Sequence, residues 1–403
     1  MPFYLSPVQF LNYFLRRKST QFFTSIAIRS LAFGMVLIFE PIYLYLYFGK
    51  SLSQTLLFFA AIYGLYGLLA VYGGKIMAKI SLRRSMLLSH FFFFGYYLSL
   101  FFIYNSPLLI PLSIVLCAIG MTLFWPAFHT DFVRFSEKGY QGQIVGKMNI
   151  AFSIPTIIAP IIGGLILTSA DYSGLFIAVL VLLFASSIPL FLSKEVHVIY
   201  SDSYQKAWKR IFKKENRKTN LAFAASAMEV GINSYLWPLF MFILAISYTQ
   251  MGGITTFALG MTALFTLYMG KISDKIINRV WFLNIGSFLT SMAWIIKYFV
   301  VTPFDAFLAH AIYGICRTSS SIPFQTLFYE KTFLKGAEAD EFIVYREIII
   351  NISRSLFFII LAGIFFVFPK INISFIIAAV MSLGFMFLGI PPKLKFKKIW
   401  TSK

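Results

Sequence analysis

Long apolar runs alternate with short polar segments along the whole chain of 403 residues. A helix needs about 20 largely apolar residues to cross the ~30 Å hydrocarbon core of a bilayer. Twelve stretches reach that length, with approximate limits at 22–48, 53–73, 85–104, 107–130, 146–169, 172–193, 220–247, 252–270, 280–301, 304–328, 343–368 and 371–390. The pattern therefore predicts an all-α membrane protein with twelve transmembrane helices.

Composition and the absence of catalytic motifs narrow the class further. Hydrophobic residues make up 59% of the chain, charged residues 12%, and the mean hydropathy is +0.79, values outside the usual range of soluble proteins. The two cysteines fall within predicted spans, and the sequence contains no HExxH, Gly-x-Ser-x-Gly or paired-carboxylate motif. We therefore expect neither an enzyme nor a bound metal or cofactor.

The distribution of Lys and Arg predicts the orientation. Loops on the amino-terminal side of the membrane carry most of the 35 Lys and Arg residues, whereas the opposite loops hold only Lys50 and Lys370. Because positively charged loops stay in the cytoplasm, both termini are expected there, in a multi-pass protein of the plasma membrane. The net charge of +20 is then explained by topology and by anionic lipid, and no nucleic-acid partner is expected.

An internal repeat predicts how the spans are grouped. The segment 74–83 returns 196 residues later as 270–279, and Gly34 and Glu40-Pro41 find Gly231 and Trp237-Pro238 at a shift of 197. Duplicated halves are typical of membrane transporters. We expect a first six-helix bundle at 1–193, a polar cytoplasmic linker at 194–218 and a second six-helix bundle at 219–403. Within the linker, apolar residues on one helical face predict a helix lying in the lipid headgroups.

The repeated segment resembles a loop motif of the major facilitator superfamily, Gly-x-x-x-Asp-Arg/Lys-x-Gly-Arg-Arg/Lys. The second copy matches it at Gly270, Asp274, Lys275 and Arg279. The first copy matches at Gly74, Lys79 and Arg83 but has Ala78 in place of the acid. The resemblance covers nearly the whole chain and implies two bundles that rock to give alternating access. It also implies that these loops form a cytoplasmic gate, whose acid is missing from the first bundle.

A second family-like segment lies in the fifth predicted span, at Pro155, Ala159, Pro160, Gly163 and Gly164. It resembles the Gly-x-x-x-Gly-Pro-x-x-Gly-Gly pattern of proton-coupled exporters, with its first two glycines replaced. Small residues let helices pack closely and prolines bend them, so any tight interface between bundles could require the same residues. An Arg that the family associates with proton coupling in the fourth span is absent, and Arg317 occupies the equivalent position of the other half.

Five charged residues lie well inside predicted spans, where each costs about 2.5–3.5 kcal/mol on insertion scales. They are Arg29, Glu40, Glu229, Arg317 and Arg354. Helical spacing places them on stripes with Tyr43, Asn233, Trp237 and His310. Spans one, four, seven and ten line the cavity in the family that the chain resembles, so these stripes are expected to face one substrate and proton pathway. Lys297, near the end of its span, is expected to snorkel to the interface.

Two roles remain open for Glu229: it could carry a proton, or it could neutralise Arg317 or Arg354 as a structural pair. The predicted function is a secondary transporter, a monomer that couples protons to the export of amphiphilic or aromatic small molecules. An aromatic content of 19% suits such substrates. The alternatives are a carrier of a small anionic metabolite, because three central Arg outnumber two central Glu, and a non-coupled lipid scramblase or sensor built on a transporter fold.

Overall fold

The structure is a computed structural model that describes residues 18–137, 141–273 and 279–389. The first bundle consists of α2 (Lys18–Val36), α3 (Glu40–Tyr47), α4 (Leu52–Ile80), α5 (Leu82–Phe101), α6 (Leu109–Glu137) and α7 (Gln141–Phe191), with a short turn η1 (Ile103–Asn105). Helix α7 contains two spans, because its backbone leaves the helical region at Ala170 and Asp171, where Asp171 has φ 53°.

The second bundle follows the linker. It consists of α9 (Arg217–Gly231), η3 (Ile232–Leu236), α10 (Trp237–Ile243), α11 (Tyr248–Ser273), α12 (Arg279–Tyr298), α13 (Pro303–Leu334), α14 (Ala339–Val367), α15 (Ile373–Leu383) and η5 (Gly384–Leu388). By length and composition alone, six helices of the described part are apolar enough to cross a membrane. Short helices that follow one another in the same direction together form one span, and α7 forms two. Counted in this way, the helices give the twelve spans and two six-helix bundles that the sequence predicts. The predicted fold class is confirmed.

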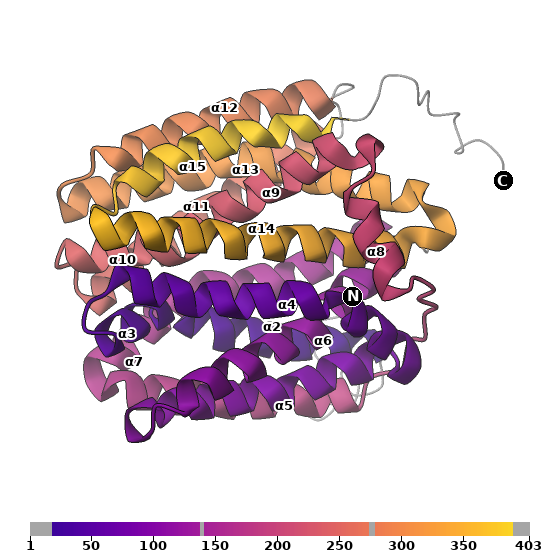
Figure 1. Cartoon of the computed structure of the whole chain (residues 1–403), viewed down its shortest axis with the longest axis horizontal. Coiled ribbons are helices and arrows are strands. Elements are labelled where there is room, and N and C mark those ends of the chain that lie inside the picture. The colour runs from indigo at the N-terminus through magenta and orange to yellow at the C-terminus, as the bar shows by residue number, and fades with distance from the viewer. Residues whose placement is uncertain (1–17, 138–140, 274–278, 390–403) are drawn as a thin grey trace, which may run out of the picture.

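The two bundles meet along two pairs of helices. Figure 1 shows the first bundle in the lower half and the second in the upper half, with α4 beside α14 along the boundary. Helix α7 packs against α11 in a second contact between the bundles. The approach is close at Gly252, where an added Cβ would lie 2.4 Å from the carbonyl oxygen of Pro160. The two backbones are therefore packed closely at this point of the boundary.

The first and seventh spans both depart from regular α-helix near their middle, at equivalent positions of the repeat. Helix α2 ends at Val36 and α3 begins with Glu40-Pro41, whereas α9 ends at Gly231 and α10 begins with Trp237-Pro238. Proline lacks a backbone N–H and cannot continue the hydrogen-bond pattern of a preceding turn. In the seventh span the connecting segment η3 is a π-helix, a geometry that often occurs at functional sites.

The linker contains helix α8 (Tyr204–Ile211), which is preceded by the N-cap Ser203 and followed by the turn η2 (Lys214–Asn216). We call the end of the molecule where α8 lies the linker end, and the opposite end the far end (Figure 1). The predicted linker helix therefore exists, but it packs on protein. The Tyr204 hydroxyl donates to the carbonyl oxygen of Leu68 in α4 at 3.3 Å, and Arg210 reaches Glu338 of the turn η4 (Gly336–Glu338), just before α14.

Candidate functional site: a central cavity between the bundles

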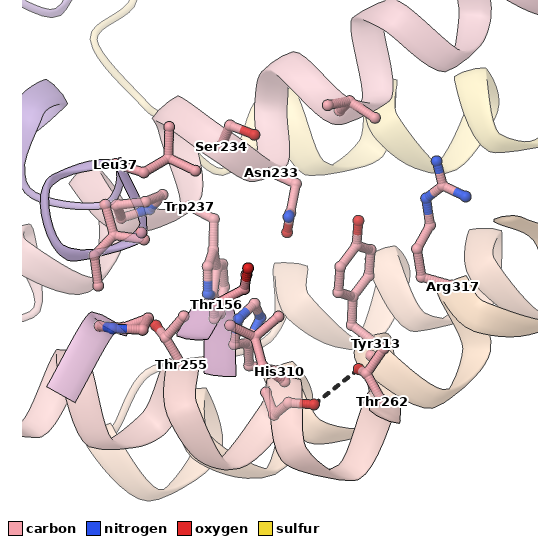
Figure 2. A pocket seen from close by; sticks show the side chains of 18 of the residues that line it. Leu37, Thr156, Asn233, Ser234, Trp237, Thr255, Thr262, His310, Tyr313 and Arg317 are labelled. Carbon is pink, nitrogen blue, oxygen red and sulfur yellow. Dashed lines mark hydrogen bonds between the residues drawn. The ribbon is translucent and has the colours of Figure 1, made fainter. Parts of the chain in front are cut away.

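A cavity of about 350 Å³ lies where the two bundles face each other. Its walls come from α2, α7, η3, α10, α11 and α13 (Figure 2). Asn233 and Trp237 enter it from η3 and α10 of the seventh span, and His310, Tyr313 and Arg317 enter it from α13. Four residues of the predicted pathway therefore line one cavity: Asn233, Trp237, His310 and Arg317.

Glu229 is fully buried beside this cavity and makes a salt bridge with Arg317. The Arg317 Nε lies 3.0 Å from the carboxylate, and Tyr313 and Trp294 donate to the same carboxylate at 2.7 and 3.0 Å. Arg354 has a different environment: its Nε donates to the backbone of Ala227 at 3.1 Å. Of the two partners that the sequence left open for Glu229, the structure selects Arg317.

The expected position of Lys297 at the membrane interface is wrong. It does not snorkel to the interface, because its side chain is fully buried and its Nζ lies 3.7 to 4.4 Å from the ring centres of Tyr313, Trp237 and Trp294. The same Nζ donates to the Asn233 Oδ1 at 3.2 Å. Rings and an amide oxygen stabilise the cation in place of water. A polar stripe on α12 could have revealed it: Ser287, Thr290, Ser291, Trp294 and Lys297 recur at helical spacing.

The charged residues of the first bundle lie away from the cavity. Glu40 is buried and accepts hydrogen bonds from Tyr96 at 2.8 Å and Tyr97 at 3.3 Å, both in α5. Arg29 is buried among the rings of Phe33, Phe93 and Phe124, at 3.4 to 5.2 Å from their centres. Within the described residues neither side chain has an ion pair. The break after Val36 explains the difference from the predicted stripe, because α2 and α3 do not continue one helical register.

Tyr43 and Arg354 also lie outside the central cavity. The Tyr43 hydroxyl donates to the carbonyl oxygen of Leu100 at 2.7 Å, and its ring lines a second cavity at the far end. The Arg354 guanidinium lies 4.5 Å from the ring centre of Tyr63 in α4, across the boundary between the bundles. The predicted pathway residues thus divide into a central group and two peripheral groups.

The predicted gate residues that the structure describes lie at the linker end. Arg83 at the start of α5 makes a buried contact of 3.6 Å with Asp131 of α6, and Arg279 at the start of α12 pairs with Glu330 of α13. Each pair thus joins the third span of a bundle to its fourth. Gly74 lies against Tyr200 and Val344, Lys79 is exposed in the last turn of α4, and Gly270 belongs to the last turns of α11. Asp274 and Lys275 lie outside the described residues.

The bundles also touch each other on both sides of the cavity. At the linker end Tyr66 of α4 donates to Glu347 of α14 at 2.8 Å, and the ring centres of Phe132 and Tyr329 lie 5.0 Å apart. At the far end the ring centres of Tyr172 and Tyr248 lie 6.0 Å apart. Aromatic contacts of this kind can separate as units when the bundles move.

The proline- and glycine-containing segment of α7 packs against both bundles. A Cβ at Gly163 would lie 2.1 Å from the carbonyl oxygen of Met35 in α2, and one at Gly164 would lie 2.5 Å from that of Tyr248 in α11. Ala159 lies against Gly34, and Pro160 against Gly252; Pro155 is half-buried one turn earlier. The segment therefore has a packing reason for its small residues, independent of any role in export.

Two six-helix bundles that enclose a cavity with buried charges define the class of secondary membrane transporters. The sequence profile of the Major Facilitator Superfamily matches residues 22–337, and the chain belongs to that family. It is therefore a multi-pass transmembrane transporter, and not an enzyme.

Known relatives are distant. The uncharacterized MFS-type transporter YttB of Bacillus subtilis (strain 168) is 25% identical over 145 residues, which are 34% of this chain and 36% of that protein. The match thus spans about a third of the relative's length.

Solved structures resemble the whole chain. The E. coli fucose:proton symporter FucP has a TM-score of 0.63 at 14% identity, covering 93% of this chain and 98% of its own. The human organic anion transporter MFSD10 has a TM-score of 0.67 at 13% identity, with 93% and 99% covered. The nucleoside transporter NupG has a TM-score of 0.68 at 15% identity, with 92% and 99% covered. At these identities the likeness establishes the fold alone.

Proposed function

We propose that the protein is a proton-coupled transporter that exports amphiphilic or aromatic small molecules, with Glu40 as the proton-carrying side chain. One observation supports this choice of acid above others. Glu40 is buried against two tyrosine hydroxyls and has no ion pair within the described residues, whereas Glu229 is already neutralised by Arg317. A buried carboxylate without a cation is made neutral by binding a proton, and a paired one keeps its charge.

The position of Glu40 also suits this role. It begins α3, directly after the break in the first span. Ile38, two residues earlier, lines the central cavity, and Tyr43, three residues later, lines the cavity at the far end. Glu40 therefore lies between residues that line the two cavities, and its buried carboxylate would exchange a proton with either side only as the bundles rock.

The central cavity suits small molecules with an apolar or aromatic part. Its volume of about 350 Å³ falls in the range of ligand sites, and Trp237, His310 and Tyr313 supply ring surface. A carrier of a small anion is the second candidate. It is favoured by one observation, that two cations, Arg317 and Lys297, lie beside the cavity against the single carboxylate of Glu229.

Transport in proteoliposomes with an imposed pH gradient tests the proposal. The substrate would come from a screen of solutes for thermal stabilisation of the purified protein. Glu40→Gln should abolish gradient-driven transport and keep exchange of substrate across the membrane, because the neutral side chain mimics the protonated state. Glu195→Gln, which alters an exposed acid at the linker end, is the control. Full gradient-driven transport by Glu40→Gln would contradict the proposal.

We also propose that the linker end faces the cytoplasm of a plasma-membrane protein that acts as a monomer. Lys206, Lys209 and Lys335 lie at the linker end, and Lys50 and Lys370 at the far end. Single cysteines at 50 and 370 should react with an impermeant thiol reagent added to intact cells, whereas cysteines at 209 and 335 should not. Labelling at 209 from outside would reverse the orientation and, with it, the direction of transport.

A further inference from the structure

A second cavity of about 350 Å³ lies at the far end, outside the central site. Its lining is mostly aromatic: Tyr43 of α3, Phe101 at the end of α5, Tyr104 of η1, Tyr172 and Phe176 of α7 and Tyr248 of α11. The Tyr43 ring centre is 4.7 Å from that of Tyr172, 5.0 Å from that of Phe176 and 6.1 Å from that of Tyr104. The lining residues therefore form a continuous set of rings around one space.

One carboxylate completes this lining. Asp171 lines the cavity from the bend of α7, is exposed, and has no hydrogen bond or ion pair in the described part of the chain. Its backbone has φ 53°, a conformation that residues other than glycine seldom adopt and that the surrounding structure must impose. The other acid of the described far-end loops, Asp305, is occupied in a capping box with Thr302. Asp171 is thus the free negative charge beside the rings.

The chemistry of this lining selects for positive charge. Aromatic faces attract a cation through the ring quadrupole, and a carboxylate adds a direct Coulomb attraction. The hydroxyls of Tyr43 and Tyr172 are engaged by the backbone carbonyls of Leu100 and Phe39, so these residues offer the cavity their rings. Among the described lining residues there is no Lys, Arg or His. The central cavity is the opposite, because Arg317 and His310 form part of its wall.

We propose that the far-end cavity is a binding site for organic cations, with Asp171 and the surrounding rings as its recognition elements. The ligand class is a small ammonium or quaternary ammonium compound that carries apolar groups. Because Tyr248 belongs to the second bundle and the other aromatic residues to the first, a bound cation would touch both bundles at the end where they must separate. The site does not depend on what the central cavity transports.

Binding of benzyltrimethylammonium to the purified full-length protein in neutral detergent, measured by calorimetry, tests this proposal. Phenylmethanesulfonate, an anion of similar size, should not bind. Asp171→Asn should raise the Kd for the cation about tenfold or more, as expected for the loss of one charge at contact distance. Asparagine tolerates positive φ, so this variant should keep the bend. Tyr104→Leu should raise the Kd several-fold, and Tyr104→Phe should not.

Two control variants locate the bound cation. Asp305→Asn removes an acid from the same end of the molecule but not from the cavity, and should leave the Kd unchanged. Asn233→Leu alters the central cavity and should also leave it unchanged. Any of three results would overturn the proposal: no binding of the cation, equal Kd values for the wild-type protein and Asp171→Asn, or loss of binding in Asn233→Leu.

Discussion

The two bundles share a backbone plan but treat their buried charges differently. In the first bundle Glu40 and Arg29 are separate, the acid held by tyrosine hydroxyls and the cation by phenylalanine rings. In the second, Glu229 and Arg317 are joined directly, beside a cavity that the first bundle's charges do not reach. The two halves therefore share the arrangement of their helices but differ in how their buried charged residues are paired.

The features that the halves share are those that shape the backbone. In both, the first span departs from regular α-helix and resumes with proline in the second position of the next helix, and both join their third and fourth spans by an ion pair at the linker end. Arg83 and Arg279 are equivalent positions of the repeat. The first bundle lacks the acid of the loop motif, but its Arg83 still has an acidic partner, because Asp131 of α6 lies beside it.

The largest expected difference between the bundles is the effect of neutralising each acid. Glu229→Gln should lower stability by about 3 kcal/mol, because it leaves Arg317 without its partner in a buried site. Glu40→Gln should change stability by less than about 1 kcal/mol, because a neutral amide can still accept from the two tyrosines. Melting temperature in detergent measures both. Equal losses of stability in the two variants would contradict the conclusion that only Glu229 is held by an ion pair.

A double variant sharpens this prediction. Glu229→Gln combined with Arg317→Met removes both charges and should recover most of the stability lost by Glu229→Gln alone. If the double variant is less stable than either single variant, the two side chains act through other partners and not through each other.

The close contact between α7 and α2 within the first bundle should give the next largest effect. Gly163→Ala should cost about 2 kcal/mol, because its Cβ would meet a backbone carbonyl oxygen at 2.1 Å and force a helix to shift. Gly253→Ala is the matched control, since an added Cβ there has no atom within 4 Å. Melting temperatures of the two variants should therefore differ by several degrees. Equal values would mean that α7 and α2 are not tightly held.

Removing the ring-bound cations should have a smaller effect. Arg29→Met and Lys297→Met each replace a buried cation that has no ion pair in the described residues with an apolar chain of similar length. Such replacements are often neutral or stabilising, so each variant should lie within about 1 kcal/mol of the wild-type protein. A loss above about 2 kcal/mol in either variant would show that the rings contribute more than solvation of the charge.

The smallest effect should come from acidification of the linker. Burial opposes ionisation of Asp202, but hydrogen bonds from Arg210 and Lys206 lower the pKa of its carboxyl below the ordinary value. A lowered pKa contributes stability that is present above the unfolded-state pKa of about 4 and is lost as pH falls through the folded-state value. The free energy of opening of α8, obtained from amide exchange after correction for the intrinsic pH dependence of exchange, should fall by at most about 1 kcal/mol below about pH 4, and Asp202→Asn should remove this dependence.

The sequence was sufficient for the fold because each of its signals is local or periodic. Apolar length marks the spans, and the repeat at 196 to 197 residues assigns them to two bundles. The ion pair of Glu229 was also within reach, since only Arg317 and Arg354 were candidate partners at mid-membrane depth. Choosing between them required the tilt and rotation of α13 and α14, which a nearly uniform apolar surface does not specify.

Other contacts depended on features that a periodic pattern does not contain. Glu40 and Arg29 share a helical stripe only if the first span is continuous, and the break between Val36 and Glu40 removes that condition. Lys297 lies close to a span end in sequence, yet rings from α10, α12 and α13 surround it. Its burial depends on two other segments of chain, α10 and α13, so position along its own span was a poor guide.

The docking of α8 gives the transport cycle a preferred resting side. Tyr204 binds α4 of one bundle, while Arg210 binds Glu338 next to α14 of the other. Separating the bundles at the linker end must break one of these attachments, whereas separating them at the far end breaks neither. If the attachment that breaks contributes about 1 kcal/mol, the docking of α8 raises the population of the conformation open at the far end roughly fivefold relative to its counterpart. The linker then favours one conformation of the transporter before substrate binds.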